Sequence, residues 1–143
     1  MNVIIRPVQL IDSEFIANLA DQLGYKTTNN KILKRLIELS QNADNHVFVA
    51  CGDNIIVGWI HGCYCLRVES DAFVEIGGLV VDKDHRKKGI AKMLIDEVIS
   101  WAKSKGINKL RVRSNIKRKE THEYYLHLGF KEIKEQRIFD LDI

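Results

Sequence analysis

Two stretches near the start of the chain place apolar side chains three or four residues apart, as an amphipathic helix does. The first follows Asp12 and Ser13, which are good N-cap residues, and Gly24 is placed to end it. The second has its cap within residues 27–30. The sequence therefore predicts two consecutive helices, each with one apolar stripe facing a core. The apolar positions are Phe15, Ile16, Leu19, Ala20 and Leu23 in the first helix and Ile32, Leu33, Leu36, Ile37 and Leu39 in the second.

Runs of β-branched and aromatic residues predict strands elsewhere in the chain. A short strand covers residues 3–7, and turns at residues 52–54 and 69–71 join three further strands as antiparallel neighbours. We expect kinks or bulges at the glycines of these strands. The three strands cover residues 46–51, 55–68 and 73–82, with a bend at Gly58 or Gly62 in the second and an interruption at Gly77 and Gly78 in the third.

A third helical pattern begins near residues 86–89 and continues to about Lys105, with Gly106 as its expected C′ residue. Its inner stripe contains Ile90, Leu94, Val98 and Trp101, with Ala91, Met93 and Ala102 beside them. A half-buried strand over 110–114, a short helix over 118–128 and a final strand or hairpin arm over 130–141 complete the chain. The order β-α-α-β-β-β-α-β-α-β predicts one α/β (α+β) domain over residues 1–143, with a mixed, mostly antiparallel sheet flanked by about four helices.

Composition narrows the class of protein. With 143 residues, 45% of them apolar and 29% charged, the chain suits one folded domain. It contains no apolar run near the roughly 20 residues that span a bilayer, and its start lacks the basic and apolar regions of a signal peptide. We therefore expect a cytoplasmic protein with no membrane partner. The net charge of +3 is too small to indicate nucleic-acid binding, although basic residues gather over 103–119 on what is either a solvated face or the side of a phosphate-rich ligand.

The three cysteines, Cys51, Cys63 and Cys65, do not indicate a disulfide framework, because an odd number is left in a chain without secretory features. No further ligands are spaced around them for a metal site, so we expect them to be small buried apolar residues. A catalytic cysteine needs an activating base. His61 would share a strand face with Cys63, which leaves that alternative open.

The stretch from His85 to Leu94 carries the clearest chemistry. It is a basic turn that opens a helix directly after the apolar run 76–81. Amides at a helix N-terminus lack partners and attract anions, Gly89 removes a Cβ from the approach, and the basic side chains 86–88 add charge. The chain has neither the P-loop pattern G-x-x-x-x-G-K-S/T nor the Rossmann pattern G-x-G-x-x-G. The turn indicates a pyrophosphate site or, more simply, the basic N-terminus of an ordinary helix.

The sequence Arg86-x-x-Gly89-x-Ala91 resembles the acetyl-CoA signature Q/R-x-x-G-x-G/A of the GNAT superfamily of N-acetyltransferases. The order of elements is similar to the GNAT acyl-CoA N-acyltransferase fold. Asn115 followed by Tyr124-Tyr-Leu-His-Leu-Gly-Phe130 resembles the superfamily segment N…Y-x-x-x-G-F. The resemblance covers nearly the whole chain and favours the cofactor alternative for the turn.

The resemblance implies that acetyl-CoA is bound as co-substrate and that no metal is used. The pantetheine arm would lie along the strand before the turn, which Gly77 and Gly78 would splay from its parallel neighbour. The implied cofactor-binding residues are Leu79, Val80, Val81, Arg86, Lys87, Lys88, Gly89, Ile90, Ala91, Lys92 and Asn115.

The resemblance also implies two catalytic residues. Tyr125 corresponds to the tyrosine that protonates the departing CoA thiolate, although a core aromatic is the alternative. Glu75 stands eleven residues before Arg86, at the offset of the general-base glutamate in the histone-acetyltransferase branch. It could instead bind a cationic substrate or lie on a solvated strand end. The implied reaction is direct attack of a primary amine on the thioester in a ternary complex.

The acceptor is expected to be an amine of a small molecule or peptide. Residues 22–25, 58–61 and 111–115 resemble bacterial proteins of the aminoglycoside 6′-acetyltransferase-like branch. The alternatives are a non-catalytic module that binds acetyl-CoA or CoA and, less favoured, a nucleic-acid-binding protein that uses the basic segment. His61 is a candidate ligand contact, and the superfamily suggests a homodimer.

Overall fold

The computed structural model describes residues 1–143, which divide into two compact units, Met1–Val112 and Arg113–Ile143. The first unit is built on a five-stranded sheet in the order β1-β2-β3-β4-β5. All neighbouring strands are antiparallel except β4 and β5, which are parallel. The strands are β1 (Val3–Pro7), β2 (Asn45–Gly52), β3 (Ile55–Cys65), β4 (Phe73–Val81) and β5 (Leu110–Val112).

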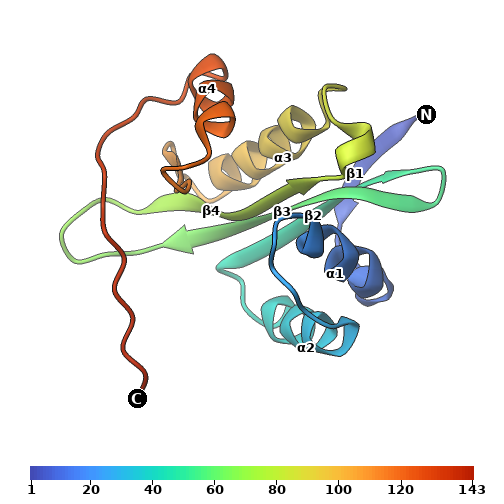
Figure 1. Cartoon of the computed structure of the whole chain (residues 1–143). Coiled ribbons are helices and arrows are strands. Elements are labelled where there is room, and N and C mark those ends of the chain that lie inside the picture. The colour runs from blue at the N-terminus through green and yellow to red at the C-terminus, as the bar shows by residue number, and fades with distance from the viewer. The chain divides into compact units, whose positions relative to one another are not determined.

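Three helices cover the two faces of this sheet (Figure 1). The helices α1 (Ser13–Gln22) and α2 (Asn29–Ser40) lie on one face, and α3 (Ile90–Ser104) lies on the other. Between α1, α2 and the sheet is a buried cluster that includes Ile16, Leu36 and Val49. The inner side of α3 carries the fully buried Leu94 and Val98. The prediction of two apolar helical stripes and a longer third helix is confirmed in outline. Phe15 of α1 and Ile37 of α2 are exposed, however, so the buried stripes are narrower than predicted. In α3, Ile95 rather than the exposed Met93 completes the buried face.

Local signals set most helix ends. Thr28 caps α2, because its hydroxyl accepts a hydrogen bond from the amide of Lys31 at 3.2 Å. Gly24 and Gly106 have φ of +85° and +75°, the left-handed conformation in which glycine ends a helix. Asp12 differs from the expectation. Its carboxylate makes no helix-cap hydrogen bond to α1 and accepts instead from both terminal nitrogens of Arg6, at 2.8 and 2.9 Å, and from the amide of Gln9.

The antiparallel meander forms as the turn signals indicate. Asp53 and Asn54 both have positive φ, as a tight hairpin requires. The register between β2 and β3 shifts beside Gly58, and that between β3 and β4 shifts beside Gly62, so both glycines lie next to irregular pairings. β3 ends at Cys65, three residues earlier than its apolar run predicts, and residues 66–72 form the connection to β4.

The second unit contains α4 (Lys119–His127), which ends before Gly129 with φ of +98°. The predicted final strand over 130–141 is wrong, because residues 130–143 form no helix or strand. The predicted strand over 110–114 is shortened to β5 at 110–112. A strand exists only where a neighbour supplies its ladder hydrogen bonds, and an alternating pattern alone does not provide that neighbour. None of the helices in the chain is both long and apolar enough to cross a bilayer.

Candidate functional site

The edge of β4 is open over its second half. β4 pairs with β3 along its length, but with β5 only at Val74, Glu75 and Ile76. The parallel ladder stops at Gly77, the extra residue of a bulge, since His61 pairs with Gly78 and the next β3 residue pairs with Ile76. Over 77–81 the backbone groups on the β5 side therefore have no β5 partner, which is the condition for an extended ligand to pair with this edge. This is the splay expected from the sequence.

The two glycines allow β4 to pass closely over side chains of β3. A Cβ on Gly78 would lie 2.7 Å from the ring of Trp59, and a Cβ on Gly77 would lie 3.1 Å from Nδ1 of His61. Leu79, Val80 and Val81 follow on the open edge, as predicted. The side chain of Val80 is buried in the cluster under α1 and α2, so this residue offers only its backbone to a ligand.

The basic turn ends in an uncapped helix. Gly89 is the N-cap of α3 with φ of +78°, no side chain caps this end, and the first turn contains no acidic residue. The amides of Ile90, Ala91 and Lys92 therefore lack intrahelical partners and carry the partial positive charge of the helix N-terminus. A Cβ on Gly89 would meet nothing within 4 Å, so its backbone conformation, rather than crowding within the protein, requires glycine there.

Hydrogen bonds from the end of α1 hold the start of this turn. The side chain of Gln22 donates to the carboxylate of Asp82 at 2.8 Å and accepts from the amide of Lys83 at 3.0 Å. Nδ1 of His85 lies 2.6 Å from the same carboxylate. The hydrogen bonds from Gln22 and His85 lower the pKa of Asp82. Arg86 donates from Nε to the carbonyl of Val81 at 3.2 Å. The role of Gln22 has no signal in the sequence, because 60 residues separate it from Asp82.

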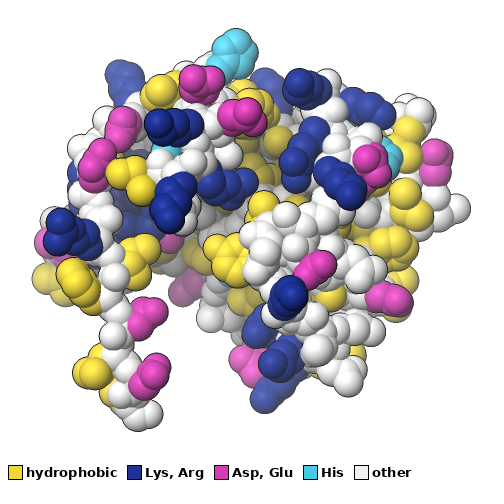
Figure 2. Space-filling view, viewed as in Figure 1, with side chains coloured by type: hydrophobic (Ala, Val, Ile, Leu, Met, Phe, Trp, Pro, Cys, Tyr) yellow, Lys and Arg dark blue, Asp and Glu magenta, His cyan; other side chains and the backbone are white.

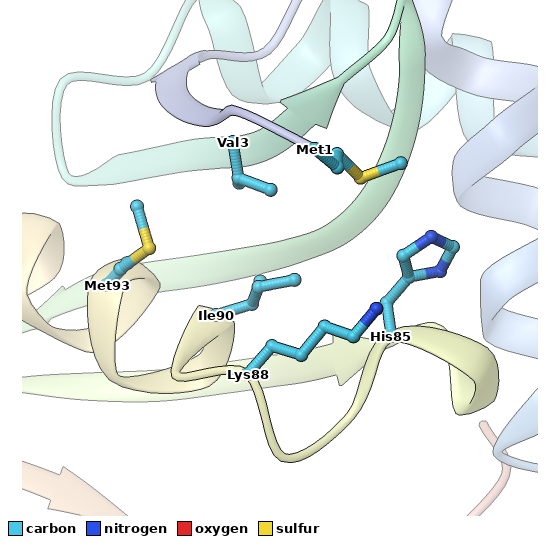
Figure 3. A pocket seen from close by; sticks show the side chains of 6 residues that line it. All are labelled: Met1, Val3, His85, Lys88, Ile90 and Met93. Atoms are coloured by element: carbon cyan, nitrogen blue, oxygen red, sulfur yellow. The ribbon is translucent and has the colours of Figure 1, made fainter.

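A pocket of about 420 Å³ lies beside the turn. Figure 3 shows Lys88 and His85 on one side of it, Met1 and Val3 from the β1 end, and Ile90 and Met93 from α3. The side chain of Lys88 thus extends toward this pocket. The side chain of Ile90 is buried, so only its amide is offered at the helix N-terminus.

A polar cluster occupies the sheet face under α1 and α2, at the Glu75 end of β4. Asn45, Cys63 and Glu75 are aligned across three strands. Nε2 of His61 lies 2.7 Å from Oδ1 of Asn45 and 3.3 Å from Sγ of Cys63. Burial lowers the pKa of His61, so its imidazole is neutral at pH 7. Sequence analysis did not find Asn45, because only the register brings it to His61.

The prediction that the three cysteines are buried is wrong. Cys51, Cys63 and Cys65 are free and partly exposed rather than buried. Burial, aided by the charges of Cys65 and Glu75, raises the pKa of Cys63 to about 11. Because the thiolate is the nucleophilic form, the pairing with His61 does not make a nucleophile at neutral pH. No group of three or more His, Cys, Asp or Glu side chains is arranged to hold a metal ion.

Two buried polar atoms have no hydrogen-bond partner within the chain. One is the indole nitrogen of Trp59, which belongs to the sheet face under α1 and α2, and the other is the hydroxyl of Ser114. Buried donors are normally paired, so each can serve a bound molecule. Neither residue was assigned a role from the sequence.

The second unit carries the other two predicted site residues. The ring of Tyr125 meets the ring of Phe130 edge-on, with centroids 5.3 Å apart. Burial raises the pKa of Tyr125, against an opposing effect of the Arg118 charge, so the phenol stays protonated at neutral pH. Asn115 organises the loop before α4, because its Oδ1 accepts from the amide of Lys117 at 2.9 Å and its carbonyl accepts from His122 at 2.8 Å.

The chain is similar to known proteins in both sequence and fold. The sequence profile of the Acetyltransferase (GNAT) family matches residues 13–130. The chain belongs to this family. A curated relative, an uncharacterized N-acetyltransferase of Methanocaldococcus jannaschii, is 34% identical over 85 residues, which cover 59% of this chain and 34% of that protein. The match thus spans about a third of the relative's length.

Solved structures show the same fold. An aminoglycoside N-acetyltransferase, AAC(6′)-Iy, solved with CoA, superposes with a TM-score of 0.88 at 21% identity, over 99% of this chain and 96% of that one. The same protein was also solved with a bisubstrate analogue that joins CoA to monomethyl-acetylneamine. An aminoglycoside 6′-N-acetyltransferase of Acinetobacter haemolyticus gives a TM-score of 0.85 at 20% identity, over 100% and 99% of the two chains. The GNAT fold expected from the sequence is confirmed.

Proposed function

We propose that this protein is an acetyl-CoA-dependent N-acetyltransferase that moves an acetyl group to a primary amine by direct attack in a ternary complex. The observation that carries the proposal is the open edge of β4. It begins at the bulge at Gly77, two residues after Glu75, and leads to the uncapped N-terminus of α3. Membership of the family supports the same reaction.

The first unit offers groups of the kinds that acetyl-CoA requires. The uncapped amides of Ile90 to Lys92 and the side chains of Arg86 to Lys88 suit a pyrophosphate. The open backbone of Leu79 to Val81 suits the amide groups of a pantetheine arm. In the second unit, Asn115 is proposed to contact the cofactor through its side-chain amide. Acetyl-CoA, when bound, supplies the activated acetyl thioester.

Glu75 is proposed to take the proton of the acceptor ammonium, directly or through water, because only the free amine has a lone pair for attack. A backbone amide on the open edge near Leu79 or Val80 would donate to the thioester oxygen as it gains negative charge. The nitrogen–carbon bond forms as the carbon–sulfur bond breaks. Tyr125, which burial keeps protonated, would donate its proton to the leaving sulfur.

Positioning of the amine against the thioester is expected to contribute most to the rate of transfer. Holding an amine against a thioester replaces a bimolecular encounter with an intramolecular one, which is worth up to about 7–11 kcal/mol. Proton transfers typically add about 10²–10⁴-fold each. The acceptor is proposed to be a small molecule or peptide. The cytoplasmic location and the homodimer stay predictions of the sequence.

The test measures CoA release from acetyl-CoA with a thiol reagent, against small amines, polyamines, aminoglycosides and peptide N-termini. We expect Glu75→Gln and Tyr125→Phe each to lower kcat by about a hundred- to ten-thousandfold, the range of general acid–base steps. Glu97→Gln and Tyr64→Phe are matched controls, because Glu97 lies on α3 and Tyr64 points toward the α3 face under Lys105. Both controls should retain wild-type rates.

Acetyl-CoA binding is measured separately by calorimetry. Gly89→Ala should weaken it, since alanine disfavours the φ of +78° that shapes the turn. Tight binding without turnover of any amine would favour the non-catalytic module over the enzyme. Absence of acetyl-CoA binding would refute both.

A further inference from the structure

Two arginines lie over one aromatic ring at the start of β4. The guanidinium carbon of Arg111, in β5, is 4.3 Å from the ring centroid of Phe73, and that of Arg67, in the β3–β4 connection, is 5.4 Å from it. The Phe73 ring is 1% exposed. The two cations are thus no more than about 10 Å apart.

Neither guanidinium has a carboxylate partner. Neither takes part in the ion pairs of Arg6, His85 and Lys92. One guanidinium over a ring gains a cation–π attraction, but a second at this range adds repulsion between like charges. An anion that contacts both would offset this repulsion, and the arginine fork matches the two oxygens of a carboxylate as it does those of a phosphate.

The pair lies beside the proposed general base. Phe73 and Glu75 are alternate residues of β4 and point to the same sheet face, and Arg111 is the register partner of Glu75. Neighbouring strands are about 4.8 Å apart, so a carboxylate and a guanidinium side chain start from adjacent positions. The β4–β5 ladder ends at Ile76, one residue further along. A molecule at this place meets an acidic group and a pair of cations within a few ångströms.

We propose that Arg67 and Arg111 bind a carboxylate of the acceptor, so that the acceptor is a small amino-acid-like molecule in which a primary amine and a carboxylate are a few bonds apart. This inference rests on the proposed acetyl transfer. The amine of the acceptor faces Glu75, and the carboxylate of the acceptor contacts the guanidiniums of Arg67 and Arg111. A polycationic acceptor fits poorly, because its additional ammonium groups would be repelled by the same two arginines.

Binding is tested without turnover, on protein loaded with CoA. The probes are product pairs that differ only in charge: the N-acetyl derivatives of alanine, leucine, phenylalanine and glutamate, each with a free α-carboxylate or as the α-carboxamide. For at least one pair we expect the carboxylate form to bind about ten- to a hundredfold more tightly, as hydrogen bonds to charged groups imply. The preference should weaken as salt is raised.

The variants assign this preference to the two arginines. Arg111→Gln and Arg67→Gln should each reduce it, and the double variant should abolish it, whereas Arg111→Lys should retain part of it because the charge remains. Lys103→Gln, an exposed change of equal charge on α3, is the matched control and should leave the preference intact. Melting temperatures show whether each variant is folded. Equal affinity of all carboxylate and carboxamide forms, or a preference that survives the double variant, would overturn the inference.

Turnover separates this inference from the function on which it rests. CoA release is measured with the free amino acids and with their carboxamides. Equal kcat/KM for the two forms would overturn the carboxylate site and leave acetyl transfer standing. A carboxylate preference in binding, with no transfer to any amine, would refute the proposed function and retain the anion site.

Discussion

The two units of the chain are stabilised in different ways, although both carry candidate site residues. Every buried side chain lies in the first unit, between Asp12 and Ala102, in the two layers that flank the sheet. The second unit has no buried residue, and its tail exposes Ile138, Phe139 and Leu141 at 83–85%. The first unit therefore contains all the buried apolar side chains of the chain, and the second contains none.

Local contacts in the second unit are nevertheless placed around the predicted residues. Asn115 ties its loop to the amide of Lys117 and to His122. Tyr125 packs against Phe130, whose amide also donates to the carbonyl of Tyr125 at 3.0 Å. Arg113 donates to the side chain of Gln136 at 2.5 Å. The scaffold for most of the proposed cofactor site is thus the unit with the buried core, and the proposed proton donor belongs to the unit without buried residues.

The largest expected difference between the two units is in the loss of unfolding free energy when a leucine of α3 or of α4 is replaced by alanine. Leu94→Ala removes a fully buried side chain from α3 and should lower the free energy of unfolding by about 2–5 kcal/mol. Leu126→Ala in α4 removes a side chain that is 54% exposed and should cost less than about 1 kcal/mol. Urea unfolding of both variants measures the difference. Similar losses in the two variants would show that α4 is as firmly packed as α3.

A smaller loss of stability, confined to the loop before α4, is expected when Asn115 is replaced. Asn115→Ala removes the Oδ1 that accepts from the amide of Lys117 and should destabilise residues 115–122 by about 1 kcal/mol, seen as faster amide hydrogen exchange there. Asn108→Ala, in an exposed loop, is the control. Asn115→Asp keeps the accepting oxygen and loses the side-chain donor. It should leave exchange unchanged but weaken acetyl-CoA binding if that donor contacts the cofactor, and unchanged binding would remove Asn115 from the cofactor site.

The smallest effect concerns pH and belongs to the first unit. Because burial lowers the pKa of His61, the unfolded chain binds a proton at a higher pH than the folded protein does. Stability is therefore complete above the ordinary histidine pKa of about 6.5 and falls as the pH drops below it. Urea unfolding between pH 5 and 8 should show this slope reduced in His61→Gln and retained in His127→Gln, an exposed change in α4. An identical slope in His61→Gln would assign the effect to other groups.

The sequence by itself determined the elements that depend on neighbouring residues. Helix ends are one example, because a cap or a left-handed φ is a property of one residue and its near neighbours. The residues at these ends are Thr28, Gly24, Gly106 and Gly129. The hairpin at residues 52–54 and the basic turn before α3 are local for the same reason. The family was also recognisable at this level, since its signature lies within that turn.

Tertiary structure alone decided what depends on residues distant in the chain. The final strand was predicted from alternation but has no ladder, and Asp12 pairs with Arg6 rather than capping α1. The contacts of His61 with Asn45, and of Arg67 and Arg111 with Phe73, arise from strand register and the connection between strands. A periodic pattern states which face of an element is apolar, but only the packed chain supplies the partner that a strand, a charge or a polar side chain requires.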